Sequence, residues 1–403
     1  MSWDRPIELR CGVQHYAWGG RGHDGQPPFI ADLLGEREPG HRPYAELWVG
    51  AHPSLSAQVV HGTGVRPLSD EIAAFPEEIL GRRLFRRGLS TLPFLLKVLD
   101  CHEPLSIQAH PDQALAERLH RRDPKNYPDA NHKPEIAIAL TPFRALCGFR
   151  PWEQIRADVV RRAALREFFG TDLGMAAGHV PAARLRRLWS RLLTAPDAEV
   201  AGVLQKLTQT PAAEGSGFPA DQLCLHLVHR FPGDRGCIAA YFLNLLNIAP
   251  GEAVFLGAGE PHAYLCGTIV ECMANSDNVV RAGLTPKFID REVLLEMLTY
   301  DDVPPLVRRG RVGAHGERIY EVPTPEFRVE IWRQEAGAAW RYSGRDTVSL
   351  LLVLSGAVRL RNASGVESRA QRGTAWLWPA ACGSLEVTAE ADATEVVRAM
   401  PAG

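Results

Sequence analysis

The stretch PGEAVFLGAGEPHAYL, residues 250–265, decides the fold class that this chain is expected to adopt. Two apolar runs flank a glycine-rich centre, a pattern that predicts two strands joined by a turn. Gly259 permits a tight turn, Pro261 stiffens the chain after it, and His262 follows at the start of the second strand. A single histidine after such a turn is more often a turn residue than a metal ligand, so His262 needs support from the rest of the chain.

This stretch resembles the second sequence motif of the cupin superfamily. It reads Gly251, five residues, Gly257 in the place of a usual proline, one residue, Gly259, two residues and His262. The resemblance implies a strand–turn–strand segment of a small jelly-roll barrel, in which the histidine binds a metal ion.

Short apolar or alternating runs separated by Gly, Pro and Asp predict β structure on both sides of this motif. They fill most of residues 1–150, return at CIAAYFLNLLNIAP from Cys237, and continue beyond Asp302. Between them, residues 152–207 carry Ala, Leu and Arg at helical spacing, and QLCLHLVHRF adds a helix after the loop PAAEGSGFPAD. The many arginines of this helical part are interpreted as a solvated face.

We therefore expect a mainly β protein with a helical insertion. The expected parts are a catalytic cupin (jelly-roll) domain over residues 1–150 and 233–300, an all-α domain over 151–232, and a second, metal-free jelly-roll domain over 301–403.

Two further helices are predicted beside the β segments. One starts at Pro111 and places Leu115 and Leu119 on one face. The other covers residues 287–298, after the capping pair Thr285 and Pro286.

Four polar side chains interrupt apolar strand patterns and together indicate a metal site. In LSIQAHPD, Gln108 and His110 lie two residues apart and share one face of a strand. In NHKPEIAIAL, Glu135 begins an apolar strand where an unpaired carboxylate would be costly to bury, although a surface pair with Lys133 is an equal alternative. With His262 these residues supply two nitrogen and two oxygen ligands, a set that suits Zn²⁺ and similar divalent ions.

Lysine is scarce in this chain, which has five lysines among 45 basic residues. Lys133 nevertheless falls in a segment that carries one of these polar residues, and Lys97, Lys287 and Arg281 fall in neighbouring segments. Cations beside a metal favour a substrate that carries a phosphate. Neither a G-x-x-x-x-G-K-[ST] loop nor a G-x-G-x-x-G motif after a strand is present in the sequence, so a nucleotide is not expected.

The bulk composition argues against several other classes of protein. A hydrophobic content of 45% with 23% charged residues is typical of a globular protein. The net charge of −2 argues against a nucleic-acid or anionic-membrane partner, and no apolar run approaches the about 18 residues of a membrane span. The first residues lack a signal-peptide pattern, and the eight cysteines form no C-x-x-C pair, so we expect a cytoplasmic protein with reduced thiols.

The site-bearing segments together resemble the type I phosphomannose isomerases, a family of zinc-dependent cupins. The resemblance runs through QHYAWGG, YAELWVGAHPS, PFLLKVLD, LSIQAHPD, NHKPEIAIAL and GEPHAYLCGTIVECMANSDNVVRAGLTPKFID. It implies one zinc ion per chain, bound by the set already assembled from chemistry: Gln108, His110, Glu135 and His262. Catalytic roles would fall on Lys133, Arg281, His132, Asp277 and Tyr264. Substrate-binding roles would fall on Trp18, Lys97, Ser106, Glu271 and Lys287.

The C-terminal part matches the family only in position and general character. GTAWLWPAACGS reads Gly373, five residues and Pro379, then Ala381 and Ser384 where a glycine and a ligand histidine would stand. It is similar to a second jelly roll that has kept the turn and lost the metal, and a structural, lid or interface role is expected for it.

The implied reaction is the reversible isomerisation of D-mannose 6-phosphate and D-fructose 6-phosphate, in which a proton moves between C2 and C1 through an enediolate. Lys133 could act as the base if burial and a nearby zinc ion favour its neutral form, and zinc-bound hydroxide is the competing base. His132 or Asp277 could assist opening of the sugar ring. Lys97, Lys287 and Arg281 are expected to share the phosphate.

Two other classes stay open from the sequence alone. A non-catalytic cupin could bind or sense a sugar phosphate in the same pocket, and only an isomerase assay separates it from an enzyme. An Fe²⁺ oxygenase would carry more histidine ligands, so Gln108 and the nearby cations argue against it. The expected partner is a small sugar phosphate, and the chain is expected to be a monomer or a weak homo-oligomer.

Overall fold

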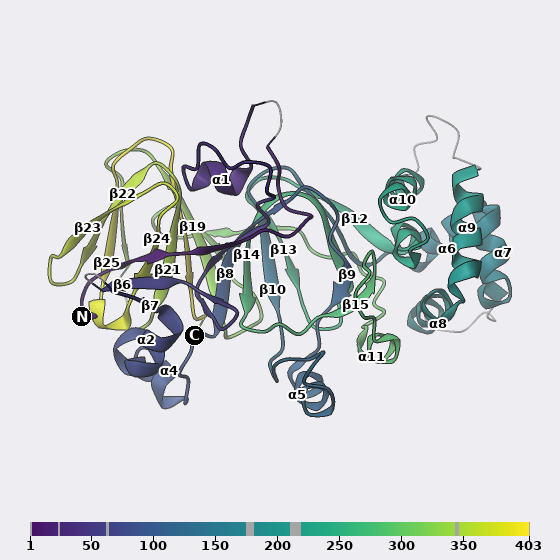
Figure 1. The fold of residues 1–403 in the computed structure, drawn as a ribbon, viewed down its shortest axis with the longest axis horizontal. Helices are drawn as coiled ribbons and strands as arrows, with labels where there is room; N and C mark the ends of the chain where they lie inside the picture. Colours follow the sequence, from purple (N-terminus) through teal and green to yellow (C-terminus); the bar gives the residue numbers. More distant parts are fainter. Residues whose placement is uncertain are drawn as a thin grey trace.

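The structure is a computed structural model that describes residues 2–22, 25–61, 64–174, 181–209, 219–342 and 346–402. β-sheets follow one another along the long axis of the molecule, and a group of helices closes one end (Figure 1). Both termini lie in the half that holds the C-terminal strands (Figure 1). The expectation of a mainly β protein with a helical insertion is therefore confirmed at this level.

The first sheet combines strands from both ends of the chain. In spatial order its strands are β17 (Arg311–Val312), β18 (Arg318–Tyr320), β19 (Arg328–Gln334), β26 (Thr394–Met400), β21 (Ser349–Ser355), β24 (Ala375–Trp378), β1 (Ile7–Arg10), β6 (Gln58–His61) and β7 (Gly64–Pro67). Leu9 of β1 lies opposite Ala375 of β24. The expected division at residues 150 and 300 separated these segments, but strand pairing joins them, because β1 fills an edge that C-terminal strands leave open.

A smaller sheet packs against the first one at the end of the molecule. It consists of β20 (Ala339–Tyr342), β25 (Leu385–Ala389), β22 (Ala357–Asn362) and β23 (Glu367–Gln371). Its inner face and the facing side of the first sheet share a core that contains Trp332, Trp340, Trp376 and Trp378. Pro379 precedes a short 3₁₀ helix, η3 (Ala380–Cys382), so Ala381 lies in that helix and Ser384 two residues after its end.

The third sheet carries the site-bearing segments and divides into two connected halves. One half consists of β16 (Arg308–Arg309), β13 (Glu252–Leu256), β10 (Glu135–Ala139), β14 (His262–Ala274), β8 (Phe94–Cys101), β3 (Glu46–Val49) and β2 (Gly12–Gln14). The other half consists of β12 (Leu243–Ile248), β11 (Phe143–Phe149), the start of β14, β9 (Ile107–Ala109) and β15 (Val280–Gly283). A separate two-stranded ribbon joins β4 (Ala51–His52) and β5 (Leu55–Ser56).

Strand β14 bends at Gly267 and links the two halves of this sheet. Gly267 has φ +108°, and a Cβ atom there would lie 2.5 Å from the carbonyl oxygen of Pro142. Only glycine tolerates both the backbone conformation and the close approach. Its turn lets one strand present His262 and Tyr264 in one half and Glu271 in the other.

The helices lie mostly at the edges of these sheets. Near the N-terminal strands are α1 (Phe29–Leu33), α2 (Leu68–Ala74), α3 (Pro76–Leu80) and α4 (Arg82–Arg86), while α5 (Gln113–Arg122) and α11 (Arg291–Met297) flank the third sheet. The insertion contains α6 (Trp152–Arg161), α7 (Ala163–Phe169), η1 (Gly170–Gly174), α8 (Pro181–Thr194), α9 (Asp197–Gln209) and α10 (Pro219–Arg230). No helix among the described residues is long and apolar enough to cross a membrane.

The helical nature of the insertion is confirmed, but its end differs from the expectation. The strand predicted from Cys237 is wrong, because Arg235–Tyr241 form a buried 3₁₀ helix, η2, before β12 begins. Asp234 caps this helix by accepting a hydrogen bond from the Gly236 amide at 2.7 Å. Residues 211–218 of the loop PAAEGSGFPAD lie outside the described part of the chain.

Two helices begin later than predicted, and an aspartate explains each difference. Helix α5 begins at Gln113 rather than Pro111, because Asp112 accepts a hydrogen bond from the Leu115 amide at 2.8 Å. Helix α11 begins at Arg291 rather than residue 287, because Asp290 accepts one from the Val293 amide at 3.1 Å. A carboxylate in this position satisfies an amide that the helix itself leaves unpaired.

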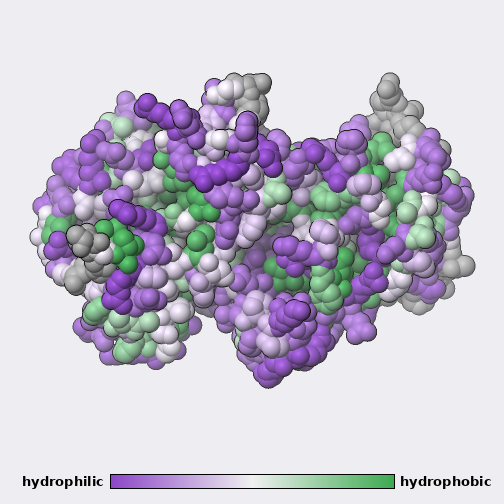
Figure 2. Space-filling model, viewed as in Figure 1, coloured by the Kyte–Doolittle hydropathy of each residue, from purple (hydrophilic) through white to green (hydrophobic). Residues whose placement is uncertain are grey.

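Apolar side chains fill the space between adjacent layers. Ile136 and Val270 of the third sheet pack against Leu350 and Leu377 of the first sheet. On the far side of the third sheet, Phe149 joins the core of the helical insertion. Hydrophilic residues cover most of the face in Figure 2, and hydrophobic residues appear there as separate patches. Against these apolar cores, the third sheet buries several polar and charged side chains.

Candidate metal centre and active-site cavity

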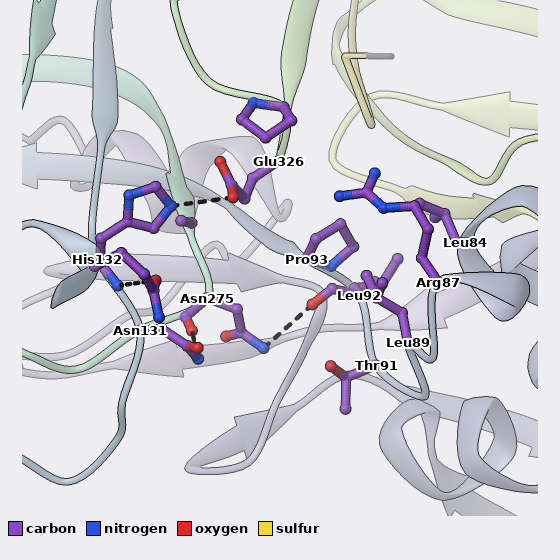
Figure 3. Close-up of a pocket in the computed structure, with 13 residues that line it drawn as sticks. Leu84, Arg87, Leu89, Thr91, Leu92, Pro93, Asn131, His132, Asn275 and Glu326 are labelled. Atoms are coloured by element: carbon purple, nitrogen blue, oxygen red, sulfur yellow. Dashed lines mark hydrogen bonds and ion pairs between the residues drawn. The ribbon is translucent and has the colours of Figure 1, made fainter. Parts of the chain in front are cut away.

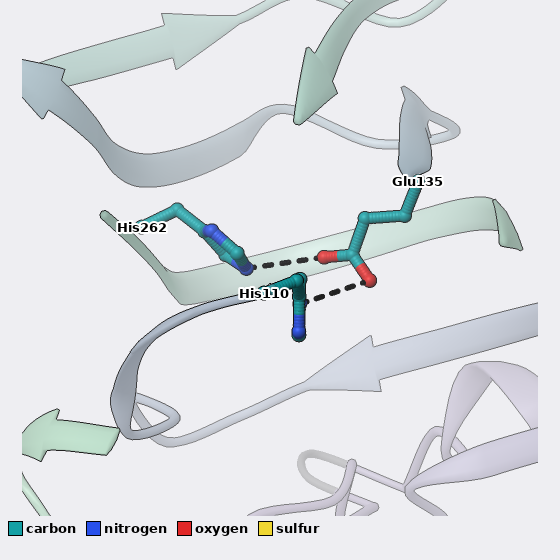
Figure 4. Close-up of side chains that lie close together, drawn as sticks. All are labelled: His110, Glu135 and His262. Atoms are coloured by element: carbon teal, nitrogen blue, oxygen red, sulfur yellow. Dashed lines mark ion pairs between the residues drawn. The ribbon is translucent and has the colours of Figure 1, made fainter. Parts of the chain in front are cut away.

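Three buried side chains from three strands meet where the two halves of the third sheet converge. His110 follows β9, Glu135 begins β10 and His262 begins β14 (Figure 4). Nε2 of His110 lies 3.4 Å from Oε2 of Glu135, and Nε2 of His262 lies 3.1 Å from Oε1. One atom from each of the three residues lies within 4.8 Å of the other two, a spacing that suits a shared metal ion.

Backbone carbonyls fix the orientation of both histidine rings. Nδ1 of His110 donates to the carbonyl oxygen of Asn278 at 2.9 Å, and Nδ1 of His262 donates to that of Glu260 at 3.0 Å. Each ring therefore turns the lone pair of Nε2 toward Glu135. Burial lowers the pKa of His110 to about 4, so its imidazole is neutral, which is the form that binds metal.

The chemistry of this cluster fits zinc. Nε2 of His110 and Oε2 of Glu135 are buried and have no hydrogen-bond partner among the described residues. Two imidazole lone pairs that face a buried carboxylate would repel it unless a cation lies between them. A divalent ion with nitrogen and oxygen ligands removes this conflict.

Gln108 lies beside the cluster in the row of paired strands. It is opposite His262 on one side and opposite Arg281 on the other. Its amide nitrogen lies 3.4 Å from Nε2 of His262, and a half-turn of the amide group would bring Oε1 to the same place. The amide therefore lies within reach of the same ion.

Gln108, Lys133 and Tyr264, which contact or adjoin the cluster, line a cavity of about 670 Å³, and Arg230 and Phe231 at the end of the helical insertion also line it. Most of the residues expected in a pocket line this cavity: Trp18, Lys97, Ser106, Gln108, Lys133, Tyr264, Glu271, Asp277, Arg281 and Lys287. The cavity volume suits a small organic molecule with several polar groups.

Lys97 lies on the inner face of the sheet in a buried row of side chains, in which its positive charge is balanced by carboxylates. Its Nζ lies 3.2 Å from Glu46, 3.6 Å from Glu271 and 4.5 Å from the centre of the Trp48 ring. Burial lowers the pKa of Lys97, but the two carboxylates outweigh this effect and hold the pKa above its ordinary value. Lys97 is therefore charged, and its charge is already balanced by protein groups.

Tyr264 links this row to the metal cluster. Its hydroxyl lies 3.0 Å from Oε1 of Glu271 and 3.3 Å from Oε1 of Glu135, so it can donate to either carboxylate. Burial, followed by repulsion from Glu135, raises the pKa of Glu271 to about 7, although Lys97 opposes the shift. The Tyr264 hydroxyl therefore lies between the carboxyl groups of Glu135 and Glu271. Two carboxylates this close and this deeply buried cannot easily both be ionised.

Lys133 is the cation nearest to the cluster. Its Nζ lies 3.6 Å from Oε2 of Glu135, and its side chain is buried in the cavity wall. The alternative of a solvated surface pair between these residues is wrong, because Glu135 is fully buried and also meets two histidines.

Arg281 and Lys287 differ from the other cavity cations in having no carboxylate within ion-pair distance among the described residues. Arg281 belongs to β15, and burial lowers its pKa. Asp277, also in the wall, lies 3.5 Å from His52 and 3.4 Å from the Ser54 hydroxyl. Two cations without anionic partners in one cavity favour an anionic ligand.

His132 is the one predicted pocket residue that the structure places elsewhere. Its ring lines a separate cavity of about 280 Å³ and lies 3.0 Å from Glu326 (Figure 3). Neighbouring residues in an extended segment point to opposite sides, so Lys133 enters the first cavity while His132 faces away. The expected part of His132 in ring opening has no support in this position.

Sequence reasoning also missed several cavity residues, among them Tyr16, Glu46, Trp48, Glu103 and Arg230. Glu46 and Trp48 lie two residues apart on β3, as Gln108 and His110 do beside β9. The same spacing within YAELWVGAHPS would have indicated them. Glu103 and Arg230 lie in or next to loops, where no periodic signal exists.

Comparisons with known proteins identify relatives along nearly the whole chain. Residues 7–152 match the family described as phosphomannose isomerase type I, catalytic domain. The mannose-6-phosphate isomerase of Macaca fascicularis is 42% identical over 383 residues, covering 89% of each chain. The enzyme of that name from Homo sapiens is 41% identical over 382 residues, with 89% of each chain covered.

Solved structures agree with these relatives. A mutant of phosphomannose isomerase from Salmonella typhimurium has a TM-score of 0.84 and 29% identity, and covers 98% of this chain and 99% of that one. A zinc-bound mannose 6-phosphate isomerase has a TM-score of 0.83 with 29% identity and covers 98% of this chain and 99% of that one.

The fold and the site define a mainly β metalloenzyme whose metal cluster lies next to a cavity lined by several cations. The chain belongs to the type I phosphomannose isomerase family. The activity of this family is the interconversion of mannose 6-phosphate and fructose 6-phosphate, and its metal is zinc.

Proposed function

We propose that this protein is a cupin that holds one zinc ion with Gln108, His110, Glu135 and His262 and isomerises its sugar phosphate by proton transfer through a cis-enediolate. The observation that carries the proposal is the buried His–Glu–His cluster, which lies next to a cavity whose wall holds two cations without a carboxylate partner among the described residues. Zinc, when bound, supplies a Lewis acid that stabilises negative charge on substrate oxygens.

The phosphate of the substrate binds to Arg281 and Lys287 in this proposal. Lys97, which was expected to share it, is already balanced by Glu46 and Glu271. It instead keeps Glu271 in place at the wall. Ser106 and Trp18 line the same cavity and complete the contacts to the sugar.

Lys133 moves the proton between C2 and C1. It is the buried amine closest to the cluster and acts as the base in its neutral form, and the aldehyde end of the sugar must lie at the cluster if its oxygens are to be stabilised there. Asp277 assists ring opening from the cavity wall, where His52 and Ser54 orient its carboxylate. Tyr264 and Glu271 hold the position of Glu135.

An isomerase assay tests the proposed function. Purified protein is expected to convert mannose 6-phosphate to fructose 6-phosphate, and to leave glucose 6-phosphate unchanged under the same conditions. Product formation is followed by coupling fructose 6-phosphate to a reporter enzyme. Tight binding of mannose 6-phosphate without conversion would instead show a non-catalytic binding protein.

A second test concerns the neutral amide in the ligand set. Gln108→Glu is expected to retain zinc but to lower kcat about 10-fold, because a second carboxylate weakens the Lewis acidity of the ion. Zinc content per chain and kcat are measured for this variant and for Gln154→Glu, which changes an exposed glutamine on α6. An unchanged kcat in Gln108→Glu would count against a ligand role for Gln108.

Three broader expectations stay predictions. The division into a catalytic cupin domain, a helical domain and a C-terminal jelly roll is compatible with the three stacked sheet layers, apart from the N-terminal strands that join the first sheet. A cytoplasmic location and a monomeric or weakly associated state rest on sequence composition alone.

A further inference from the structure

The helical insertion contributes two residues to the wall of the active-site cavity. Arg230 ends helix α10, and Phe231 follows it directly. The arginines of the insertion were interpreted as a solvated face, and Arg230 departs from that pattern because it lines the same cavity as Lys287 and Arg281.

Arg230 forms an ion pair that joins the helical insertion to another segment of the cavity wall. Its Nη2 lies 2.8 Å from Oε1 of Glu103, which belongs to the loop after β8. The amide of Glu103 donates to the carbonyl oxygen of Trp18 at 3.1 Å, so this loop is fixed to the N-terminal wall. The Arg230 side chain is 44% exposed, which leaves it free to change partners.

Asp234 fixes the end of the insertion to the segment that carries Lys287. Its carboxylate accepts hydrogen bonds from the amides of Leu284 at 2.9 Å and Thr285 at 3.0 Å. Leu284 has φ +54°, an unusual value for a branched residue that these bonds help to maintain. The chain end that follows Arg230 is therefore attached to the segment that carries Lys287.

We propose that Arg230 is a third phosphate-binding cation, which exchanges Glu103 for the phosphate dianion when substrate enters. This inference rests on the proposed function, because it assigns an additional contact to the same substrate. A guanidinium can bind a phosphate through two parallel N–H donors, and a phosphate dianion carries more negative charge than the partly buried carboxylate of Glu103, so it binds Arg230 more strongly. Glu103 is then a competitor of the phosphate as well as a partner of Arg230.

Two variants of the pair test this exchange, because it predicts effects of opposite sign. Arg230→Gln is expected to raise the KM for mannose 6-phosphate and the Kd of inorganic phosphate about 10-fold, with kcat nearly unchanged. Glu103→Gln is expected to lower the Kd of inorganic phosphate two- to threefold, since it releases Arg230. The Kd is measured by calorimetry on the zinc-loaded protein.

Arg187→Gln serves as the matched control, because Arg187 forms an exposed ion pair with Asp172 within the insertion and away from the cavity. A phosphate Kd in Arg230→Gln equal to that of Arg187→Gln would overturn the proposal. Weaker phosphate binding in both Arg230→Gln and Glu103→Gln would also overturn it. That result would mean that the ion pair only stabilises the cavity wall and that Arg230 does not bind phosphate. If the unmodified protein lacks isomerase activity, the proposed function fails, while the phosphate Kd values still decide the role of Arg230.

Discussion

Removal of the metal ion is expected to abolish isomerase activity, and addition of Zn²⁺ is expected to restore it. The two imidazoles and the carboxylate of the cluster are buried, and their facing atoms lie only 3.1 and 3.4 Å apart. Lys133 lies 3.6 Å from the same carboxylate, but a lysine ammonium group has no vacant coordination position for the two imidazole lone pairs and so does not replace the ion. Since a Lewis acid contributes several kcal/mol to such a reaction, kcat/KM should fall at least about 1000-fold after chelation and dialysis.

A histidine pair provides the matched comparison for this experiment. His110→Ala is expected to lose zinc and activity together. His120→Ala should keep both, because His120 donates to the Tyr127 carbonyl outside the cavity. Zinc per chain is measured by elemental analysis, and circular dichroism checks the fold of each variant. Full activity in metal-free protein, or one zinc ion retained by His110→Ala, would show that the metal assignment is wrong.

The metal cluster was predictable because strand periodicity acts locally. Gln108 and His110 are two residues apart, and Glu135 and His262 each begin an apolar strand, so each residue could be placed on an inner face from its own segment. That these faces meet depends on long-range pairing. Register alone places Gln108 opposite both His262 and Arg281, and no single segment carries that information.

The same limit explains what the sequence could not show. Lys97 was expected to share the phosphate, and its ion pairs with Glu46 and Glu271 could not be foreseen, because these partners come from strands 51 and 174 residues away along the chain. The pairing of β1 with β24 links residues more than 360 positions apart, so composition could not reveal it. Helix starts were misplaced by two and four residues, because proline was given priority over the aspartate that caps each helix.

Replacement of Lys133 is expected to lower kcat about 1000-fold with little change in KM. General-base catalysis contributes about 10²- to 10⁴-fold, and Lys133 is the buried amine closest to the place where the proton must move. Its loss should not remove the phosphate contacts, because Arg281 and Lys287 stay in place. The expected signature of Lys133→Met is therefore a fall in kcat and in kcat/KM by the same factor.

A deuterated substrate and a control substitution at a second lysine test whether Lys133 moves the proton. With mannose 6-phosphate deuterated at C2, Lys133→Met should show a larger primary isotope effect than the unmodified protein, since proton abstraction becomes more rate-limiting. Lys125→Met, at an exposed loop position outside the cavity, should behave as the unmodified protein does. Zinc content must be equal in all three proteins, because Lys133 lies 3.6 Å from Glu135 and its loss could disturb the ion. A higher KM with unchanged kcat would assign Lys133 to substrate binding, and the proton would then have to move through another group of the cavity wall.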